Sequence, residues 1–144
     1  MSASNTPWQL DSRLRADTLV VSEDQDLMLL LMNDRRWPWL IIVPKQPGAE
    51  EWSDLEAGLG DRVFERVQSA GDRLKDFTNC TKINIAAIGN MVRQLHIHVI
   101  ARSVDDPNWP APVWGYGQAE KYDAKQADEL IGNLKDHLFD TPIS

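Results

Sequence analysis

Residues 94–102, QLHIHVIAR, carry two of the chain's three histidines at alternate positions within an apolar run. A period of two is typical of a β-strand, in which successive side chains point to opposite faces. The pattern predicts that Leu95, Ile97 and Val99 face a hydrophobic core and that His96 and His98 share the other face with Gln94. At about 3.3 Å per residue the two histidines lie roughly 6.6 Å apart, close enough to contact one phosphate group or one metal ion.

The rest of the chain predicts an α+β domain with helices covering one face of a five-stranded antiparallel sheet. Apolar runs bounded by turn-forming residues indicate four more strands, at 17–22, 27–32, 40–43 and 82–87. The segment Ser53-Asp54-Leu55-Glu56 resembles a capping box and predicts the start of a long amphipathic helix that reaches Phe77. A second helix is predicted from Asp123 to the C-terminus.

Composition limits the possible partners. The 144 residues, 42% hydrophobic, predict a single domain over 1–144, with a core at about 8–104 and a Trp/Pro-rich loop and helix at 105–140. A net charge of -7 argues against nucleic acid as a partner. Cys80 is the only cysteine and is interpreted as an inert thiol. Residues 1–6 lack signal-peptide features and no apolar run is long enough to span a membrane, so a cytoplasmic protein with no membrane partner is expected.

Three interpretations of His96 and His98 compete on the residues alone. The imidazoles could be structural groups on a polar sheet face. They could be two ligands of a metal site, but a third ligand is hard to find, because His137 is expected near the surface of the last helix. In the third interpretation a neutral imidazole nitrogen attacks a phosphate and forms a phosphoramidate that water later cleaves.

Residues 89–102 resemble the signature of the histidine triad (HIT) superfamily, in which three histidines alternate with apolar residues after a glycine-bearing loop. The strand that ends in Pro44-Lys45 and the helix entered near residues 52–55 resemble the same family. The resemblance implies a HIT-like fold, a homodimer built around a shared sheet, and a nucleotide hydrolase or transferase that acts on the α-phosphate without a cofactor or metal.

The resemblance also implies roles for individual residues. His96 matches the family's nucleophile, and His98 matches the last triad histidine, which would contact the phosphate or assist the leaving group. Gln94 replaces the first triad histidine, and Trp39 stands where many members carry a further active-site histidine. An amide can donate and accept hydrogen bonds but cannot carry a proton's charge.

Other polar residues are expected to bind the substrate. Asn33 or Asp34 falls where the family holds ribose hydroxyls, and Asn84 and Asn90 fall where polar loop residues approach phosphate. Arg102 shares strand parity with His96, so its cation could reach the phosphates, although a solvated arginine is an equal alternative. The proline-flanked tryptophans Trp37, Trp39, Trp109 and Trp114 are expected to pack in loops, with base stacking or dimer contact as the alternative.

The sequence therefore predicts transfer or hydrolysis of a nucleoside monophosphate group through an intermediate on His96. The substrate would be a small nucleotide, either a dinucleoside polyphosphate or a nucleoside phosphoramidate. The alternative is a nucleotide-binding or regulatory protein with weakened catalysis, because both departures from the family pattern, Gln94 and Trp39, fall at the catalytic face.

Overall fold

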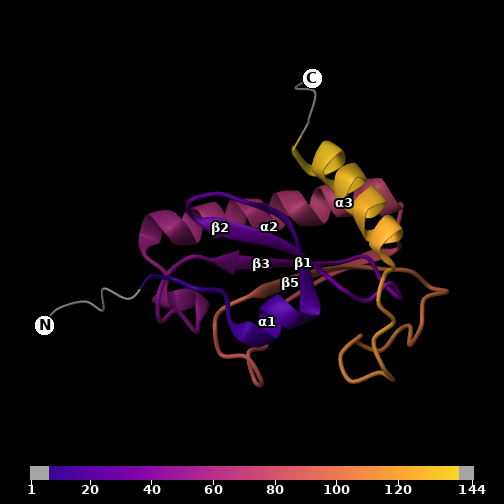
Figure 1. The fold of residues 1–144 in the computed structure, drawn as a ribbon, viewed down its shortest axis with the longest axis horizontal. Helices are drawn as coiled ribbons and strands as arrows, with labels where there is room; N and C mark the ends of the chain where they lie inside the picture. The colour runs from indigo at the N-terminus through magenta and orange to yellow at the C-terminus, as the bar shows by residue number, and fades with distance from the viewer. Residues whose placement is uncertain (1–6, 140–144) are drawn as a thin grey trace, which may run out of the picture.

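A five-stranded antiparallel sheet organises the chain in the computed structural model, which describes residues 7–139. Figure 1 shows the sheet with the long helix α2 running along it and α3 packed near one end of that helix. The strands are β1 (Thr18–Glu23), β2 (Leu27–Met32), β3 (Trp39–Pro44), β4 (Lys82–Ala86) and β5 (Ile97–Arg102). The helices are α1 (Ser12–Asp17), the short 3-10 helix η1 (Trp52–Asp54), α2 (Ala57–Thr78) and α3 (Ala124–Phe139).

The strand order is β1-β2-β3-β5-β4, and every neighbouring pair is antiparallel. The histidine strand β5 therefore lies inside the sheet, hydrogen-bonded to β3 on one side and to the edge strand β4 on the other. His98 pairs with Ile41 of β3 and with Ala86 of β4. Pairing on both sides fixes the direction of the β5 side chains.

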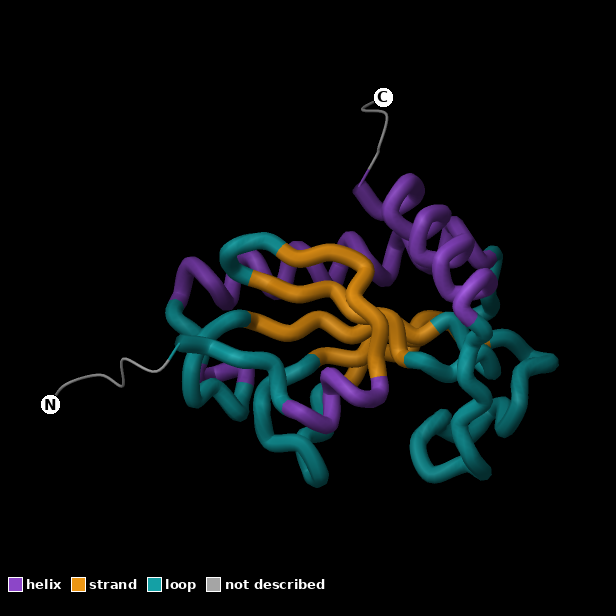
Figure 2. The backbone as a smooth tube through the Cα atoms, in the orientation of Figure 1, coloured by secondary structure: helices purple, strands orange, loops and turns teal. Residues whose placement is uncertain are grey.

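The side of the sheet covered by α2 and α3 forms the helix-side core. Leu95, Ile97 and Val99 are at most 4% exposed there and pack among apolar residues of β2, β3, α2 and α3. Burial of each of these side chains stabilises the fold by about 1.5–3 kcal/mol. Figure 2 shows α2 alongside the strands, and the register that buries these residues places His96 and His98 on the opposite face.

The opposite side of the sheet forms the histidine-side core, which is rich in aromatic residues. Trp37, Trp39 and Val113 are buried here, with Trp8 and Trp114 packed against them. The predicted helices α2 and α3 cover one face as expected, while Leu10 and Leu14 bring the N-terminal segment and α1 onto this one. Helix α1 follows Asp11, whose carboxylate accepts a hydrogen bond from the Arg13 N–H, and was not predicted.

The predicted α+β fold is confirmed, with the first four strands within one residue of their expected bounds. The predicted start of the long helix at residue 53 is wrong, because α2 begins at Ala57. The Gln46 amide donates to the carbonyl of Asp54 and accepts from the N–H of Glu56, which holds Leu55 extended between η1 and α2. The helix ends at Thr78, and Asn79 adopts the left-handed conformation typical of a helix C-terminus.

The start of β5 also differs from the prediction, since the ladder begins at Ile97 rather than Gln94. The N–H of Leu95 donates to the carbonyl of Ala49, in the loop after β3, so it does not take part in the hydrogen bonds of the sheet. Alternation nevertheless continues through Leu95, which lies in the helix-side core.

Parts of some predictions lie outside the described residues: the domain bounds at residues 1 and 144, the signal-peptide argument on residues 1–6, and the last residue of the predicted terminal segment. Within residues 7–139, no helix is both long and apolar enough to cross a membrane.

Candidate active site

His96 and His98 lie side by side on the histidine face, as the spacing predicts. Their ring centroids are 5.0 Å apart and the rings meet edge to face. His96 is 7% exposed and His98 5%, so both rings are largely covered by protein.

A backbone contact orients the His96 ring. Its Nδ1 lies 2.7 Å from the carbonyl oxygen of Gln94. A carbonyl only accepts hydrogen bonds, so Nδ1 is the nitrogen that carries the proton in this contact. In the neutral ring Nε2 then holds a free lone pair, which is the nitrogen that a nucleophile or metal ligand uses.

Two tryptophans surround His98. The indole Nε1 of Trp39 donates a hydrogen bond of 2.9 Å to Nδ1 of His98, with ring centroids 5.6 Å apart. Trp114, from the Trp/Pro-rich loop, places its ring edge to face with His98 at 5.1 Å. Burial by these groups, with a smaller contribution from the neighbouring His96, lowers the pKa of His98 to about 3. His98 is therefore neutral at physiological pH.

The Gln94 side chain contacts the N-terminal segment of the chain. Its Oε1 accepts from the N–H of Asp11 and its Nε2 donates to the carbonyl of Gln9, both at 2.9 Å. One amide thus forms hydrogen bonds with two backbone groups. A neutral imidazole also has one donor and one acceptor nitrogen, but they lie on opposite sides of its ring. Gln94 was expected to bind substrate, and here its amide holds residues 9–11 beside the histidines.

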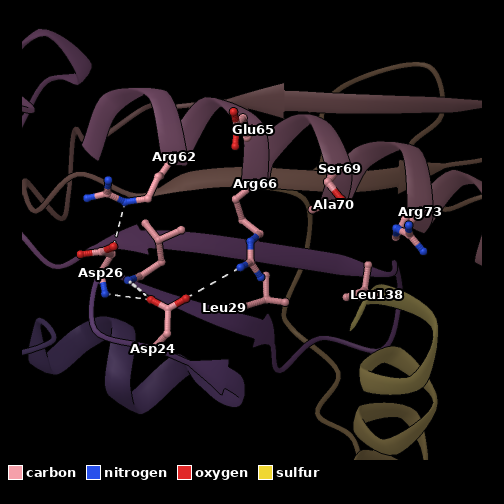
Figure 3. A pocket seen from close by; sticks show the side chains of 11 residues that line it. Asp24, Asp26, Leu29, Arg62, Glu65, Arg66, Ser69, Ala70, Arg73 and Leu138 are labelled. Atoms are coloured by element: carbon pink, nitrogen blue, oxygen red, sulfur yellow. Dashed lines mark hydrogen bonds and ion pairs between the residues drawn. The ribbon is translucent and has the colours of Figure 1, made fainter. Parts of the chain in front are cut away.

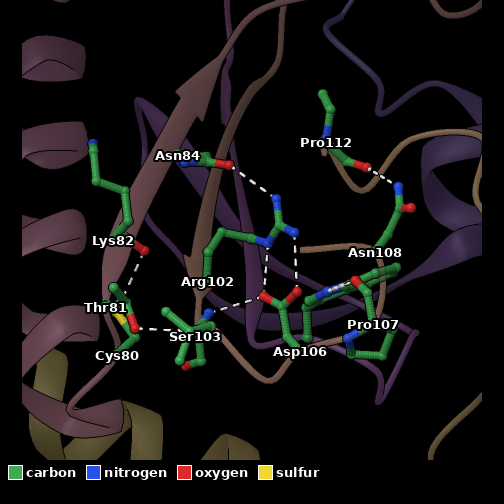
Figure 4. A network of polar contacts seen from close by, with 12 residues as sticks. Cys80, Thr81, Lys82, Asn84, Arg102, Ser103, Asp106, Pro107, Asn108 and Pro112 are labelled. Carbon is green, nitrogen blue, oxygen red and sulfur yellow. Dashed lines mark hydrogen bonds and ion pairs between the residues drawn. The ribbon is translucent and has the colours of Figure 1, made fainter. Parts of the chain in front are cut away.

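Arg102 lies on the histidine face but its guanidinium is engaged. It is 1% exposed, and its Nε and one terminal nitrogen donate to the Asp106 carboxylate at 2.8 and 3.0 Å. The other terminal nitrogen lies 3.2 Å from Oδ1 of Asn84 (Figure 4). Burial raises the pKa of Asp106, but hydrogen bonds from Arg102 and from the Ser103 N–H outweigh it, and the pKa lies below its ordinary value.

The remaining predicted substrate contacts are dispersed. Asn33 accepts a hydrogen bond from the N–H of Tyr122 and so ties the end of β2 to the segment before α3. The buried carboxylate of Asp34 forms two hydrogen bonds with the Arg36 guanidinium. Asn90 is exposed in the loop between β4 and β5. The structure brings together His96, His98 and the Gln94 backbone, while Asn33, Asn84 and Arg102 make internal contacts.

Sequence reasoning missed two residues of this site. Trp39 was noted as a departure from the family, but its bond to His98 could have been suspected only from its place five residues before Pro44. Trp114 gave no signal, because the loop that carries it has no periodic pattern. The loop is held over the site by long-range contacts such as that between Trp37 Nε1 and the carbonyl of Pro107.

A cavity of about 420 Å³ lies away from the histidines, between the β1–β2 turn, the side of α2 that faces it and the end of α3 (Figure 3). Arg62 pairs with Asp26 at 2.8 Å and Arg66 with Asp24 at 3.8 Å across it. Its three arginines and three acidic residues offset one another: Arg62, Arg66, Arg73, Asp24, Asp26 and Glu65. The cavity therefore carries no net charge that would select an anion or a cation.

The metal interpretation needs a third ligand beside His96 and His98. Among residues 7–139, no group of three or more histidine, cysteine or acidic side chains is arranged to hold a metal ion. His137 lies between α2 and α3, with its Nε2 3.0 Å from the Asp76 carboxylate. Cys80 is buried, and its thiol lies 3.5 Å from the carbonyl of Lys82.

Comparison with known proteins places this geometry in context. The HIT domain family model matches residues 13–105, which run from α1 through the end of β5. Among curated proteins, none matches the chain.

Solved structures cover almost the entire chain. A histidine triad protein from Bradyrhizobium japonicum is 37% identical, with a TM-score of 0.89 over 93% of this chain and 100% of its own. One from Sinorhizobium meliloti is 40% identical, with a TM-score of 0.88 over 91% and 97% of the two chains. One from Marinobacter aquaeolei is 36% identical, with a TM-score of 0.90 over 95% and 100%.

Proposed function

The chain belongs to the HIT domain family, and from that premise we propose that it transfers or hydrolyses a nucleoside monophosphate group through an intermediate on His96. Family membership supports nucleotide binding and hydrolase or transferase chemistry. The substrate we propose is a dinucleoside polyphosphate or a nucleoside phosphoramidate attacked at its α-phosphate. No cofactor or metal is part of the proposal.

The observation that carries the proposal is the contact between His96 Nδ1 and the Gln94 carbonyl. It keeps the proton on Nδ1 and leaves the Nε2 lone pair for attack on phosphorus. In the first step the N–P bond forms as the bond to the leaving group breaks. In the second step water attacks phosphorus, the N–P bond breaks, and the nucleoside monophosphate is released.

The neighbouring groups support this chemistry. His98 stands beside His96 with one nitrogen not bound to Trp39, so it can donate to an oxygen of the reacting phosphate. We propose Asn90, exposed in the loop before β5, as a further phosphate contact. Because Asp106 and Asn84 already bind the Arg102 guanidinium, we assign Arg102 to positioning the loop rather than to the substrate.

We also propose that the protein is a homodimer with a sheet shared across β4. This strand is the edge next to β5, so its outer backbone groups have no neighbour in the sheet order. Ile85 on β4 is 50% exposed, which provides apolar surface at that edge. Size measurement in solution tests this, and a monomer at all concentrations would contradict it.

The test is release of nucleoside monophosphate from an adenylylated substrate with no added metal. We expect His96→Ala to reduce the rate by about a thousandfold or more while nucleotide binding persists, because the nucleophile is removed and the other proposed substrate contacts are not. His137→Ala is the matched control, because that histidine lies between α2 and α3 and should leave turnover unchanged. Equal turnover by His96→Ala and the unaltered protein would rule out the mechanism.

A second candidate function is nucleotide binding without turnover. The low exposure of His96 and the engagement of the Gln94 amide by residues 9–11 favour it. This candidate predicts measurable nucleotide affinity by calorimetry and no product above background. Steady release of product that depends on His96 would exclude it.

A further inference from the structure

Resting on the proposed function, we propose that Trp39 is a positioning residue that fixes His98 as a neutral hydrogen-bond donor, so that the site selects phosphoanhydrides over phosphoramidates. This goes beyond the family resemblance, because it depends on a tryptophan where many members carry a histidine. It also chooses between the two substrate classes that the proposed function leaves open.

The first step of the argument is the direction of one hydrogen bond. The indole nitrogen of Trp39 carries a hydrogen and no available lone pair, so it can only donate. Its contact of 2.9 Å therefore requires that Nδ1 of His98 accept. The single proton of the neutral ring must then lie on Nε2, the nitrogen free to face a substrate.

The second step is that this contact excludes the protonated ring. An imidazolium carries a hydrogen on both nitrogens and would place the N–H of Nδ1 against the N–H of Trp39. Both residues lie on paired interior strands, Trp39 opposite Ile100 and His98 opposite Ile41, so neither backbone can turn away. Trp37 and Trp114 also pack edge to face on the Trp39 ring, at 6.2 and 6.1 Å.

The electrostatic surroundings act in the same direction. Among the described residues in ring contact with His98, His96 immediately precedes β5, Trp39 comes from β3 and Trp114 from the loop before α3. None of these is an anion that would favour a charged imidazole. Burial and His96 together lower the pKa of His98 to about 3.

The third step concerns the leaving group. When His96 attacks an anhydride, the P–O bond breaks and its electron pair leaves on a phosphate oxygen, a stable anion that needs no proton. When it attacks a phosphoramidate, the P–N bond breaks and the nitrogen must gain a proton before or as it leaves. A neutral Nε2–H can hydrogen-bond to the phosphate but is too weak an acid to supply that proton.

Nuclear magnetic resonance of ¹⁵N-histidine-labelled protein tests the hydrogen bond without any activity. We expect the His98 proton on Nε2 from about pH 5 to about pH 8, with no charged form in that range. Trp39→Phe keeps an aromatic ring but removes the donor, and should admit the other tautomer or the charged form. Trp114→Phe is the matched control, because it alters packing on His98 but leaves the Trp39 donor. A proton on Nδ1 in the unaltered protein would overturn the proposal.

Kinetics test the selection between substrates. We expect release from diadenosine triphosphate to exceed release from an alkylamine phosphoramidate of adenosine in kcat/KM. Trp39→His supplies a ring that can accept or donate, and should shift that ratio toward the phosphoramidate by about tenfold or more, within the range of acid catalysis. An unchanged ratio, or a phosphoramidate preference in the unaltered protein, would overturn the proposal.

The two tests separate the two levels of inference. No product from either substrate, together with the Nε2–H form of His98, would mean that the proposed function fails while the role of Trp39 stands. Product from both substrates at equal rates would mean that the proposed function stands and the selection fails.

Discussion

The two faces of β5 are built on different principles. On the helix side, Ile97 and Val99 pack among aliphatic side chains, and another apolar residue of similar volume would serve nearly as well. On the histidine side, His98 and Arg102 each have a named polar partner, Trp39 and Asp106, at a set distance. On the helix side, the loss of stability should therefore scale with the change in side-chain volume. On the histidine side, it should depend on whether the substitution leaves a buried polar partner without its hydrogen bond.

The largest expected effect comes from separating Arg102 from Asp106. Arg102→Met should lower the free energy of unfolding by about 3–5 kcal/mol, because it leaves a carboxylate without its buried counter-charge. Urea denaturation measures this. The double variant Arg102→Met with Asp106→Leu removes both charges and should recover most of the loss. If the double variant were as unstable as the single one, Arg102 would stabilise the histidine side through its packing and not through its pairing with Asp106.

Next in size is the effect of removing the Gln94 amide. Gln94→Leu loses two hydrogen bonds to the N-terminal segment, at about 0.5–1.5 kcal/mol each. Hydrogen exchange at the Asp11 amide should accelerate accordingly. Gln9→Ala is the control, because Gln9 contributes its carbonyl and its own side chain is exposed. Unchanged protection of Asp11 in Gln94→Leu would show that the amide does not hold this segment.

The histidine side should also respond to pH where the helix side does not. The pKa of His98 is about 3 in the folded protein, against an ordinary value of 6.5. Below pH 6.5, His98 therefore binds a proton in the unfolded chain but not in the folded one. The free energy of unfolding should fall with decreasing pH, by up to about 1.4 kcal/mol per unit, and level off above 6.5. Denaturation between about pH 5 and 7 measures it, above the titration of ordinary carboxylates. The slope should decrease in His98→Asn, and an equal slope would assign it to another group.

The smallest expected loss of stability comes from a substitution in the helix-side core. Ile97→Val removes one buried methylene and should cost about 0.5–1.5 kcal/mol with the activity of the folded protein retained. Ile85→Val, at a half-exposed site on β4, should change the stability by less. Similar losses at both sites would contradict a tightly packed core under β5.

The same division explains what the sequence could predict. The alternation of Leu95, Ile97 and Val99 fixes which residues enter the helix-side core, since periodicity is a local property of the chain. It also placed His96 and His98 together. The capping box at residues 53–56 misled because Gln46, earlier in the chain, binds the backbone groups that a helix would use.

The polar partners on the histidine side were beyond prediction. From the sequence, Arg102 is expected to be a free cation, but in the structure it binds Asp106. Gln94 is expected to be a substrate ligand, but its side chain binds the N-terminal segment at residues 9–11. Trp114 gives no local signal at all. Each of these contacts involves an irregular segment of the chain, where neither hydrophobic periodicity nor a capping pattern indicates which groups meet.

The place of β5 in the sheet has a consequence for how the protein folds. β2 joins β3 through a short connection and β5 follows β4, but β3 meets β5 only after α2 and β4 intervene in the chain. Contacts between distant parts of a chain form slowly, because the intervening loop must first close. The bond between Trp39 and His98 spans that closure, so we expect the imidazole pair to acquire its chemistry late in folding. A nascent chain would then reach its reactive form only when synthesis has passed the last strand and the sheet has closed.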